Sequence, residues 1–314
     1  MALDLLDAGR EVVVLDDLST GFAETIPAGA RFVQGDIGDE ALVRRLVREH
    51  GVDTVIHFAA KAVVPESVAD PSAYYDTNTG KTARLLRGAA TGGATSFVFS
   101  STSSVYGDVG AEPVKETAPL RPVSPYGRSK LAAEWLVQDA GAAYGLNYAI
   151  LRYFNVAGAD AKGRAGQSTA AATHLIKAAC QAALGMRPSL LIYGDDYDTP
   201  DGTGVRDYIQ VNDLASAHSA ALAHLECGGE SLVMNCGYGH GFSVKDVVEA
   251  VRRVSGVAFE AQIVERRPGD PASVIADCGV LRTKLNWRPQ YDDLDVIVAQ
   301  AYAWEQRLAT ARAA

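Results

Sequence analysis

The chain has 314 residues, of which 48% are hydrophobic and 21% are charged, and its formal net charge is -9. This composition is ordinary for a folded globular protein, and the length fits one large α/β unit or two domains. The acidic balance argues against nucleic acid or an anionic membrane surface as the main partner. No apolar run in the sequence approaches the length of a membrane span, so we expect no membrane partner.

The four cysteines stand at positions 180, 227, 236 and 278. They form no Cys-x-x-Cys pair and no spacing typical of metal ligands, so we expect buried, reduced thiols and no metal site. The first residues carry two aspartates and lack the profile of a signal peptide. Together these features predict a cytoplasmic protein.

Predicted strands and helices alternate through the first half of the chain. ALDLLDAG (2–9) has the pattern of an amphipathic helix closed by a glycine, and EVVVLDD (11–17) that of a buried strand ending on two acids. Further strands are predicted at 31–36, 52–60, 96–107 and 147–155, and helices at 39–51, 71–91 and 124–145. Because these strands are apolar on both faces, the sequence predicts an α/β fold with a doubly wound parallel sheet.

This alternation ends after Asn155. Loops rich in Gly, Asp and Pro follow at 158–169 and 194–204, among shorter strands and helices. We therefore expect a dinucleotide-binding domain over 1–155 and a smaller α/β domain over 156–314. The second domain is expected to close over the carboxyl ends of the sheet strands, where ligands bind in such folds.

A helix that leads into a hydrophobic strand ending in Asp is the second half of a dinucleotide-binding βαβ unit. An acid at that place accepts hydrogen bonds from the adenine ribose and repels a 2′-phosphate, so Asp16 and Asp17 favour NAD over NADP. Asp36 ends the next strand, where the adenine ring would lie. Acids at strand ends are also common turn formers, so this signal by itself leaves both interpretations open.

The first strand and the glycine-rich phosphate turn of such a unit precede its helix, whereas here only Met1 does. The expected strand would lie between EVVVLD and DTVIHFA (53–59), at the centre of the sheet. We therefore expect the functional protein to be longer by roughly 15–20 residues. The chain from Met1 is expected to bind NAD poorly, to aggregate and to have weak or no activity.

Tyr126 and Lys130, in SPYGRSK, stand four residues apart on a predicted helix and share one face. A tyrosine with the usual pKa of about 10 is a poor base at neutral pH, and a nearby ammonium favours its phenolate form. Such a pair is by itself common on solvated helix faces. Thr102, in FSSTSSVYG at the end of the preceding strand, adds a hydroxyl for a shared substrate oxygen. The three residues together indicate a site for proton and hydride transfer.

Seven motifs now stand in order: VVVLDDLSTG, HFAAKAVVPESV, SSVYG, SPYGRSK, LRYFNVAGA, GTGVRDYIQVNDLA and RRPGDPASVIAD. With them the chain resembles, from residue 2 to about residue 302, the NAD-dependent epimerase/dehydratase family of extended short-chain dehydrogenases/reductases. The closest likeness is to its members that epimerise UDP-sugars. The resemblance implies a Rossmann-type sheet, here without its first strand. It also implies NAD as cofactor, a UDP-sugar as substrate and a cytoplasmic homodimer.

The resemblance implies a role for particular residues. Thr102 and Tyr126 are the implied catalytic hydroxyls, and Lys130 is implied to bind the nicotinamide ribose and to tune Tyr126. Besides Tyr126 and Lys130, the implied NAD site comprises Asp16, Asp17, Thr20, Gly21, Asp36, Ile37, Phe58, Ala59, Ala60, Ser100 and Phe154. Besides Thr102 and Tyr126, the implied nucleotide-sugar site comprises Asn155, His174, Leu175, Tyr193, Arg206, Arg267, Asp270 and Val274.

Several of these assignments have an alternative. Arg206 and Arg267 are expected to clamp the diphosphate, because two phosphates need two cations in an acidic chain, but both are also compatible with surface charges. Tyr193 is placed to stack on uracil, or equally to pack as a core ring. His174 stays open between a nucleotide contact and no role. Val274 falls against the sugar's 2-substituent, and its small size predicts activity on N-acetylated sugars.

Two positions depart from the family's pattern. Lys61 stands one place earlier than usual within HFAAKAVVPESV, which leaves a lysine contact to NAD in doubt. Thr77 stands where a cofactor-contacting asparagine is usual, with Asn78 directly after it.

The implied reaction is redox-neutral inversion at C4 of UDP-glucose or UDP-galactose through a transient 4-keto sugar. Related dehydratases need an acid beside the catalytic threonine, and related decarboxylases usually carry a glutamate there; Ser103 and Ser104 favour the epimerase. Two alternatives stay open. One is an epimerase acting mainly on UDP-N-acetylglucosamine or a UDP-pentose, and the other is an inactive, truncated epimerase-like protein.

Overall fold

The computed structural model describes residues 1–110, 112–169, 174–267 and 269–313. The α-helices are α1 (Ala2–Asp7), α2 (Glu40–His50), α3 (Val64–Ala69), α4 (Pro71–Tyr75), α5 (Thr82–Gly92), α6 (Pro125–Tyr144), α7 (Leu175–Ala183), α8 (Val211–Glu226), α9 (Val244–Ser255), α10 (Gly279–Lys284) and α11 (Leu294–Ala313). Two 3-10 turns, η1 (Ala23–Thr25) and η3 (Ser103–Val105), and a π-helical segment, η2 (Asp76–Lys81), complete the helical elements.

The strands are β1 (Val13–Asp16), β2 (Arg31–Gln34), β3 (Thr54–His57), β4 (Ser96–Thr102), β5 (Asn147–Tyr153), β6 (Asn155–Ala157), β7 (Leu190–Tyr193), β8 (Val205–Arg206), β9 (Tyr208–Gln210), β10 (Leu232–Cys236), β11 (Phe242–Ser243), β12 (Ala261–Val264) and β13 (Ser273–Val274).

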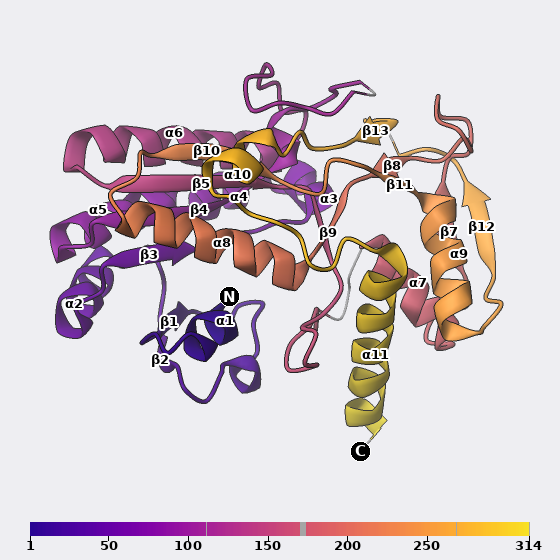
Figure 1. The fold of residues 1–314 in the computed structure, drawn as a ribbon, viewed down its shortest axis with the longest axis horizontal. Coiled ribbons are helices and arrows are strands. Elements are labelled where there is room, and N and C mark those ends of the chain that lie inside the picture. Colours follow the sequence, from indigo (N-terminus) through magenta and orange to yellow (C-terminus); the bar gives the residue numbers. More distant parts are fainter. Residues whose placement is uncertain (111, 170–173, 268, 314) are drawn as a thin grey trace.

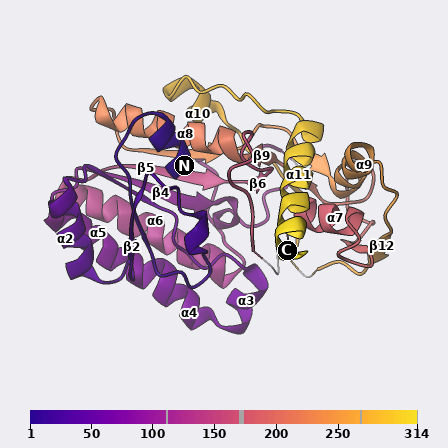
Figure 2. The ribbon, with the colours of Figure 1, turned by 90° about the horizontal axis from the view of Figure 1, so that it is seen from below.

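The main sheet has the strand order β10-β5-β4-β3, and every neighbouring pair is parallel. Its strands are buried on both faces: Phe97 and Phe99 lie with α2, α5 and α6 on one side, and Val98 and Leu151 lie with α8 on the other. Figure 2 shows this order of layers, with α8 above the sheet and α2, α5 and α6 below it. The fold class predicted from the sequence, a parallel sheet covered by helices on both faces, is confirmed.

β1 and β2 form a separate two-stranded parallel sheet, which lies below β3 in Figure 1. β3 is an edge strand of the main sheet. The sequence analysis expects a further strand between the segments that form β1 and β3. Among the described residues no strand is paired with either of them on that side, so β1 and β3 each have a single strand neighbour.

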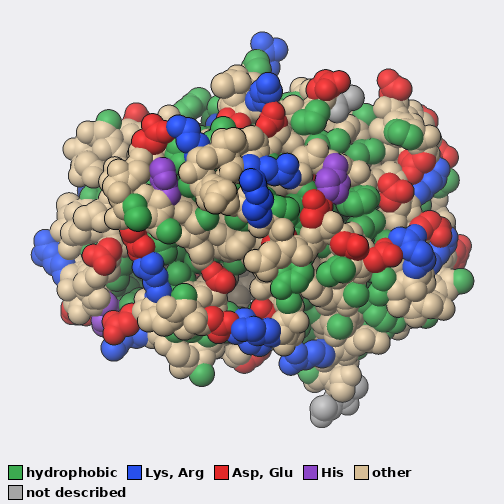
Figure 3. Space-filling model, viewed as in Figure 1, with side chains coloured by type: hydrophobic (Ala, Val, Ile, Leu, Met, Phe, Trp, Pro, Cys, Tyr) green, Lys and Arg blue, Asp and Glu red, His purple; other side chains and the backbone are tan. Residues whose placement is uncertain are grey.

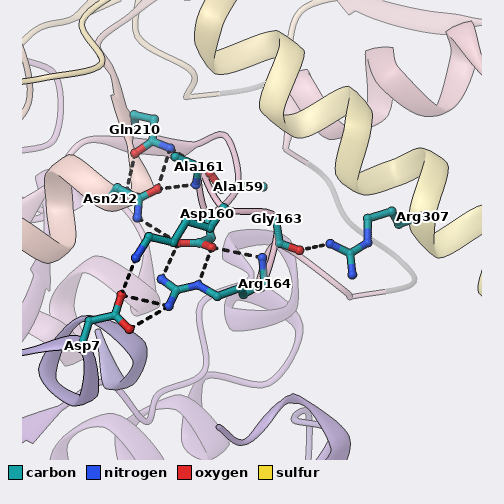
Figure 4. A network of polar contacts seen from close by, with 10 residues as sticks. Asp7, Ala159, Asp160, Ala161, Gly163, Arg164, Gln210, Asn212 and Arg307 are labelled. Carbon is teal, nitrogen blue, oxygen red and sulfur yellow. Dashed lines mark hydrogen bonds and ion pairs between the residues drawn. The ribbon is translucent and has the colours of Figure 1, made fainter. Parts of the chain in front are cut away.

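Polar contacts fix α1 to the loop that follows β6 (Figure 4). Asp7 accepts hydrogen bonds from Lys162 and Arg164, each at 2.9 Å. Arg164 donates through Nε to Asp160 at 2.9 Å, and Asn212 at the start of α8 donates to the same carboxylate at 3.1 Å. The hydrogen bonds from Arg164 hold the pKa of Asp160 well below its usual range. The N-terminal helix is therefore tied to both the loop and α8.

A smaller unit lies beside the main sheet. It contains the parallel pair β7-β12, the three-stranded sheet β11-β8-β13 and helices α7, α9 and α11 (Figure 1). After β6 the chain forms β7 and β8 of the smaller unit and β9, which pairs with β6. It then returns to the main sheet through α8 and β10. The main sheet thus takes strands from both sides of the boundary that the sequence analysis expects between residues 155 and 156.

The four cysteines are all free. Cys180, Cys236 and Cys278 are buried as expected, whereas Cys227 is exposed because it follows the last turn of α8 at the surface. None of the described helices combines the length and the apolar character that crossing a membrane requires.

The sheet core generates a stability prediction. Ile150 is fully buried in the middle of β5, so Ile150→Ala leaves a cavity and should lower the free energy of unfolding by about 3 kcal/mol. Val123→Ala is the control, because this side chain is 62% exposed, and its effect should stay within about 0.5 kcal/mol. Urea denaturation of the variants measures both values, and equal losses would contradict the core placement of Ile150.

Candidate active site

Thr102 lies at the carboxyl end of β4, and Tyr126 lies in the first turn of α6. β4 lies inside the sheet between β3 and β5, and Thr102 is its last residue. α6 begins with Ser124 as its N-cap, whose hydroxyl accepts from the Gly127 amide at 3.1 Å, and with Pro125 in the first turn. The Thr102 side chain lies close enough to the Tyr126 hydroxyl to act against the rise in its pKa. The sequence-predicted pair therefore meets at the carboxyl end of a buried strand.

A glycine allows this approach. A Cβ atom on Gly127 would lie 2.6 Å from the carbonyl oxygen of Ser104, so the first turn of α6 touches the backbone of η3. Every larger residue would push the helix away from η3. η3 directly follows Thr102 and Gly127 directly follows Tyr126, so this close contact lies beside both residues.

Burial dominates the electrostatics of the two ionisable groups on α6. It raises the pKa of Tyr126, against which the hydrogen bond from Thr102 acts. It lowers the pKa of Lys130 to about 7, against which the charge of Glu134 acts. The Lys130 ammonium lies 4.3 Å from the centre of the Phe99 ring. The sequence analysis expects Lys130 to favour the phenolate form of Tyr126; in the structure the group acting in that direction is the Thr102 hydroxyl.

The expected adenosine-binding acids lie at the carboxyl ends of β1 and β2. Asp16 accepts from the amide of Leu18 at 2.7 Å, and Asp17 accepts from the amide of Ser19 at 2.9 Å, so the loop that contains Thr20 and Gly21 curls around these acids. A Cβ atom on Gly21 would lie 3.3 Å from the Asp16 carboxylate, so glycine keeps that carboxylate open.

The third acid, Asp36, is paired with Lys81, whose ammonium donates to it at 2.6 Å. This contact and a hydrogen bond from Gly38 lower the pKa of Asp36 against the effect of burial. The sequence analysis does not single out Lys81. It lies 45 positions from Asp36, and only the packing of η2 near the end of β2 brings them together.

The remaining residues of the implied NAD site follow the carboxyl ends of neighbouring strands. Ile37 comes after β2, Phe58, Ala59 and Ala60 come after β3, Ser100 lies near the end of β4, and Phe154 comes after β5. The Phe58 ring is 45% exposed and lies 5.2 Å from the ring of His218 on α8. Phe154 is buried. The set therefore lies at the carboxyl ends of strands from two sheets, the β1-β2 pair and the main sheet.

Asn78 takes the polar position next to Thr77. Its side chain is buried, accepts from the Lys61 amide at 2.8 Å and donates to the Ser129 hydroxyl at 3.0 Å. Asn78 thereby joins the loop after β3 to α6. Its contact on α6 is Ser129, the residue before Lys130. The ammonium of Lys61 is paired with Glu66 at 2.8 Å.

Two residues of the implied sugar-nucleotide site lie in register in the smaller unit. Arg206 on β8 and Val274 on β13 are Cα partners of neighbouring parallel strands. Val274 packs against a buried cluster that contains Phe154 and Leu131, the residue after Lys130. The second unit is thus joined to the Tyr126 region through this cluster.

Two consecutive arginines stack on two tyrosines. The Arg267 guanidinium lies 3.7 Å from the centre of the Tyr193 ring, and that of Arg266 lies 4.0 Å from the centre of the Tyr197 ring. Asp270 closes the same turn, donating from its amide to the Arg267 carbonyl at 3.2 Å. The half-buried Tyr193 ring therefore holds a flat cation on one face.

Tyr197 is a residue that the sequence analysis missed. It is buried, and burial followed by the charge of Asp270 raises its pKa, whereas Arg266 and Arg206 act in the opposite direction. Its place in the polar loop at 194–204 gave no sign of burial. Its contacts put it among the residues expected to bind the diphosphate.

Three further residues of the implied substrate site border a cavity of about 420 Å³: Asn155, His174 and Leu175. The cavity lies between α1, α7, α8 and α11, and its described lining does not include Thr102, Tyr126 or Lys130. His174 is the exposed N-cap residue of α7. The face of the molecule in Figure 3 shows acidic and basic side chains interspersed rather than one broad patch of a single sign.

Comparison with known proteins identifies the family. Residues 1–237 match the model of the NAD dependent epimerase/dehydratase family. The chain belongs to this family. The resemblance found in the sequence motifs is thus confirmed.

The relatives of this family member include UDP-glucose 4-epimerases from several bacteria. The enzyme of Azospirillum brasilense is 54% identical over 97% of this chain and 87% of its own length. The crystal structure of UDP-glucose 4-epimerase from Brucella ovis in complex with NAD superposes with a TM-score of 0.93 at 42% identity, covering 96% of this chain and 93% of that one. The UDP-Glc/GlcNAc 4-epimerase from Campylobacter jejuni superposes with a TM-score of 0.83 at 44% identity, covering 97% and 94%.

The contact at Gly127 generates a second prediction. Gly127→Ala should lower the free energy of unfolding by about 1–3 kcal/mol, because the new methyl group collides with the Ser104 carbonyl. Gly80→Ala is the matched control, since a Cβ there meets its nearest atom at an ordinary 3.5 Å, and helix propensity should raise stability by up to about 1 kcal/mol. Urea denaturation compares the two, and a stabilising effect at position 127 would contradict the close approach.

Proposed function

We propose that this chain is an NAD-dependent epimerase that inverts C4 of a UDP-sugar, with UDP-glucose and UDP-galactose as substrates and a transient 4-keto sugar as intermediate. The observation that carries the proposal is the meeting of Thr102, Tyr126 and Lys130 at the carboxyl end of β4. The UDP-glucose 4-epimerases among the relatives support the choice of reaction and substrate.

The residues at the ends of β1 and β3 fit NAD. Asp16 presents a carboxylate that Gly21 leaves open, which suits the two hydroxyls of an adenine ribose and disfavours a 2′-phosphate. Phe58, exposed at the end of β3, supplies an apolar wall on the same edge. Thr20, Ile37, Ala59, Ala60, Ser100 and Phe154 complete the proposed cofactor site. NAD, when bound, supplies the acceptor and donor of the hydride.

In the proposed reaction Tyr126 is the base that removes the proton from the sugar 4-hydroxyl and later returns it. Thr102 is proposed to hold the same oxygen, because its side chain lies close to the Tyr126 hydroxyl. Lys130 supplies the positive charge that a phenolate on the same helix face needs. Since its pKa is lowered to about 7 by burial, contacts that restore its charge favour the reaction.

The smaller unit is proposed to hold the nucleotide. Arg206, Arg267 and Asp270 come from neighbouring segments, and the arginines offer the two cations that a diphosphate needs. The proposed uracil-binding ring is Tyr193, whose face already accepts a flat cation. Asn155, His174 and Leu175 are the further proposed contacts, and Val274 is proposed to lie against the sugar.

The arrangement favours epimerisation over dehydration. The positions beside Thr102 are occupied by Ser103 and Ser104 in η3, and neither can protonate a leaving hydroxyl as an acid would. The buried carboxylate of Glu134 binds Arg152, and the partly buried one of Glu116 accepts from the Asn235 backbone amide at 2.8 Å, so both have partners elsewhere.

We also propose that the enzyme is a cytoplasmic homodimer. Apolar side chains are exposed on three helices that pack together: Val68 on α3, Tyr75 on α4, and Trp135 and Tyr144 on α6. A second copy with the same face would cover them. The free cysteines agree with a reducing compartment.

The role of Tyr126 has a direct test. Tyr126→Phe removes the base and little contact area, so kcat should fall by about 10³-fold or more while UDP-sugar binding stays nearly intact. Thr102→Ala should lose less, roughly 10- to 100-fold, because it removes a hydrogen bond rather than the proton acceptor. A coupled assay of UDP-galactose conversion with NAD present measures kcat, and calorimetry with UDP measures binding. Turnover of Tyr126→Phe within a few-fold of the parent would refute its role.

The size of the sugar pocket has a separate test. Valine at position 274 leaves room for a 2-acetamido group, so the enzyme should epimerise UDP-N-acetylglucosamine beside UDP-glucose. Val274→Tyr should lower the relative kcat/KM for the acetylated sugar by roughly 10- to 200-fold. Competition between the two sugars, with the parent and the variant side by side, gives this ratio. Equal rejection of the acetylated sugar by both proteins would show that residue 274 does not set the limit.

A further inference from the structure

A buried ion pair adjoins the Tyr126 region, and the reaction described above assigns it no part. Arg152 on β5 donates to Glu134 on α6 through Nε at 3.0 Å and through Nη2 at 2.6 Å. The side chains are 4% and 0% exposed, so both charges are withdrawn from water. Ser101, the register partner of Arg152 on β4, donates its hydroxyl to the same carboxylate.

The three partners lie on α6, β4 and β5, and the first two of these elements carry the proposed catalytic groups. Glu134 shares α6 with Tyr126 and Lys130, and Ser101 immediately precedes Thr102. Arg152 lies two positions before Phe154. A shift of α6 along the sheet would break the bidentate contact to Arg152 and the contact to Ser101 at once. The pair therefore fixes α6 against β4 and β5 in one register.

The remaining terminal nitrogen of Arg152, Nη1, is also hydrogen-bonded. Its Nη1 donates to the Tyr106 hydroxyl at 2.9 Å, and this hydroxyl donates to Asn235 Oδ1 on β10 at 2.7 Å. Tyr106 and Asn235 are buried as well. The orientation of Arg152, and through it that of Glu134, is thus determined by a fourth element of the sheet.

Stability by itself is a weak reason for such a pair, because apolar residues of similar volume often replace a buried ion pair without loss. A second observation concerns charge. Glu134 follows Lys130 by one helical turn, and its negative charge raises the pKa of Lys130 while burial lowers it.

The other ionisable groups around α6 do not supply this charge. His57 on β3 is buried, and burial lowers its pKa to about 3, so it is neutral. Lys61, in the loop after β3, is paired with Glu66 on α3, and Lys81 on η2 is paired with Asp36. Glu134 is accordingly the carboxylate whose charge acts on Lys130.

We propose that Glu134 is a positioning residue of the epimerase: with Arg152 it fixes α6 on the ends of β4 and β5, and its carboxylate supports the ammonium form of Lys130. The inference rests on the proposed function, because it assigns Glu134 a part in that reaction. Glu134 acts through Lys130 and Tyr126 and has no contact of its own with the substrate.

Two variants test the proposal in the NAD-supplemented enzyme. Glu134→Gln keeps the shape of the side chain and removes its charge. The double variant Glu134→Leu with Arg152→Met removes both charges and keeps the volume apolar, which avoids an unpaired buried arginine. Val137→Ala, at a fully buried apolar position on the same helix, is the control for a loss of stability without a change of charge. For each protein, kcat and KM for UDP-galactose are measured as functions of pH, together with the thermal midpoint.

In both charge variants the alkaline limb of the kcat profile should move to lower pH by about one unit, because Lys130 loses its proton more easily. At alkaline pH kcat should fall about tenfold, while KM stays within about twofold, since the proposed nucleotide contacts lie on other elements. Val137→Ala should lower the thermal midpoint and leave the limb in place.

The proposal would be overturned if the alkaline limb of the kcat profile stayed at the same pH in a charge variant that folds. It would also be overturned if Val137→Ala moved this limb by an equal amount. A parent enzyme that binds UDP but does not interconvert the two sugars would instead refute the proposed function, which separates the two failures.

Discussion

The contact between the first turn of α6 and the backbone of η3 determines the geometry on which the rest of the site depends. Gly127 lets the helix reach the Ser104 carbonyl, and this contact lies beside both Thr102 and Tyr126. The position of α6 further along its length is set by polar contacts, from Asn78 to Ser129 and from Arg152 to Glu134. One backbone contact and two buried polar contacts therefore align this helix with the sheet.

The same alignment has an electrostatic cost. Lys130 is buried and Tyr126 is partly buried, and burial opposes the charged form in which each of them is proposed to act. The hydroxyl of Thr102 and the carboxylate of Glu134 act against burial at the two groups. These two neighbours reduce the effect of burial on both groups, but burial still leaves the pKa of Tyr126 above and that of Lys130 below its ordinary value.

Much of the fold could be predicted from the sequence because its signals are local. The period of the apolar residues predicted the strands β1 to β5 and the helices α2 and α6, and capping by Ser124 and Pro125 marks where α6 begins. The spacing of Tyr126 and Lys130 is a property of one helix and was equally visible.

Contacts between distant segments could not be predicted in this way. Lys81 meets Asp36, Arg152 meets Glu134, and Tyr197 is buried among charges, and none of these follows from a neighbouring residue. The return of β10 to the main sheet depends on the path of the whole chain through the smaller unit. The motifs therefore predicted the proposed reactive groups. The residues that shift their pKa values, such as Glu134 beside Lys130, could be found only from the tertiary structure.

The stacking of Arg267 on Tyr193 has a consequence for the order of events at the nucleotide site. One face of an aromatic ring accommodates a single flat partner, and here the guanidinium already covers it at 3.7 Å. A pyrimidine that takes this face must displace the arginine, and the displaced guanidinium is then free to meet a phosphate attached to the same molecule. If Tyr193 and Arg267 bind the nucleotide as proposed, recognition of the base and capture of the charge are one exchange, which a sugar phosphate without a base does not start.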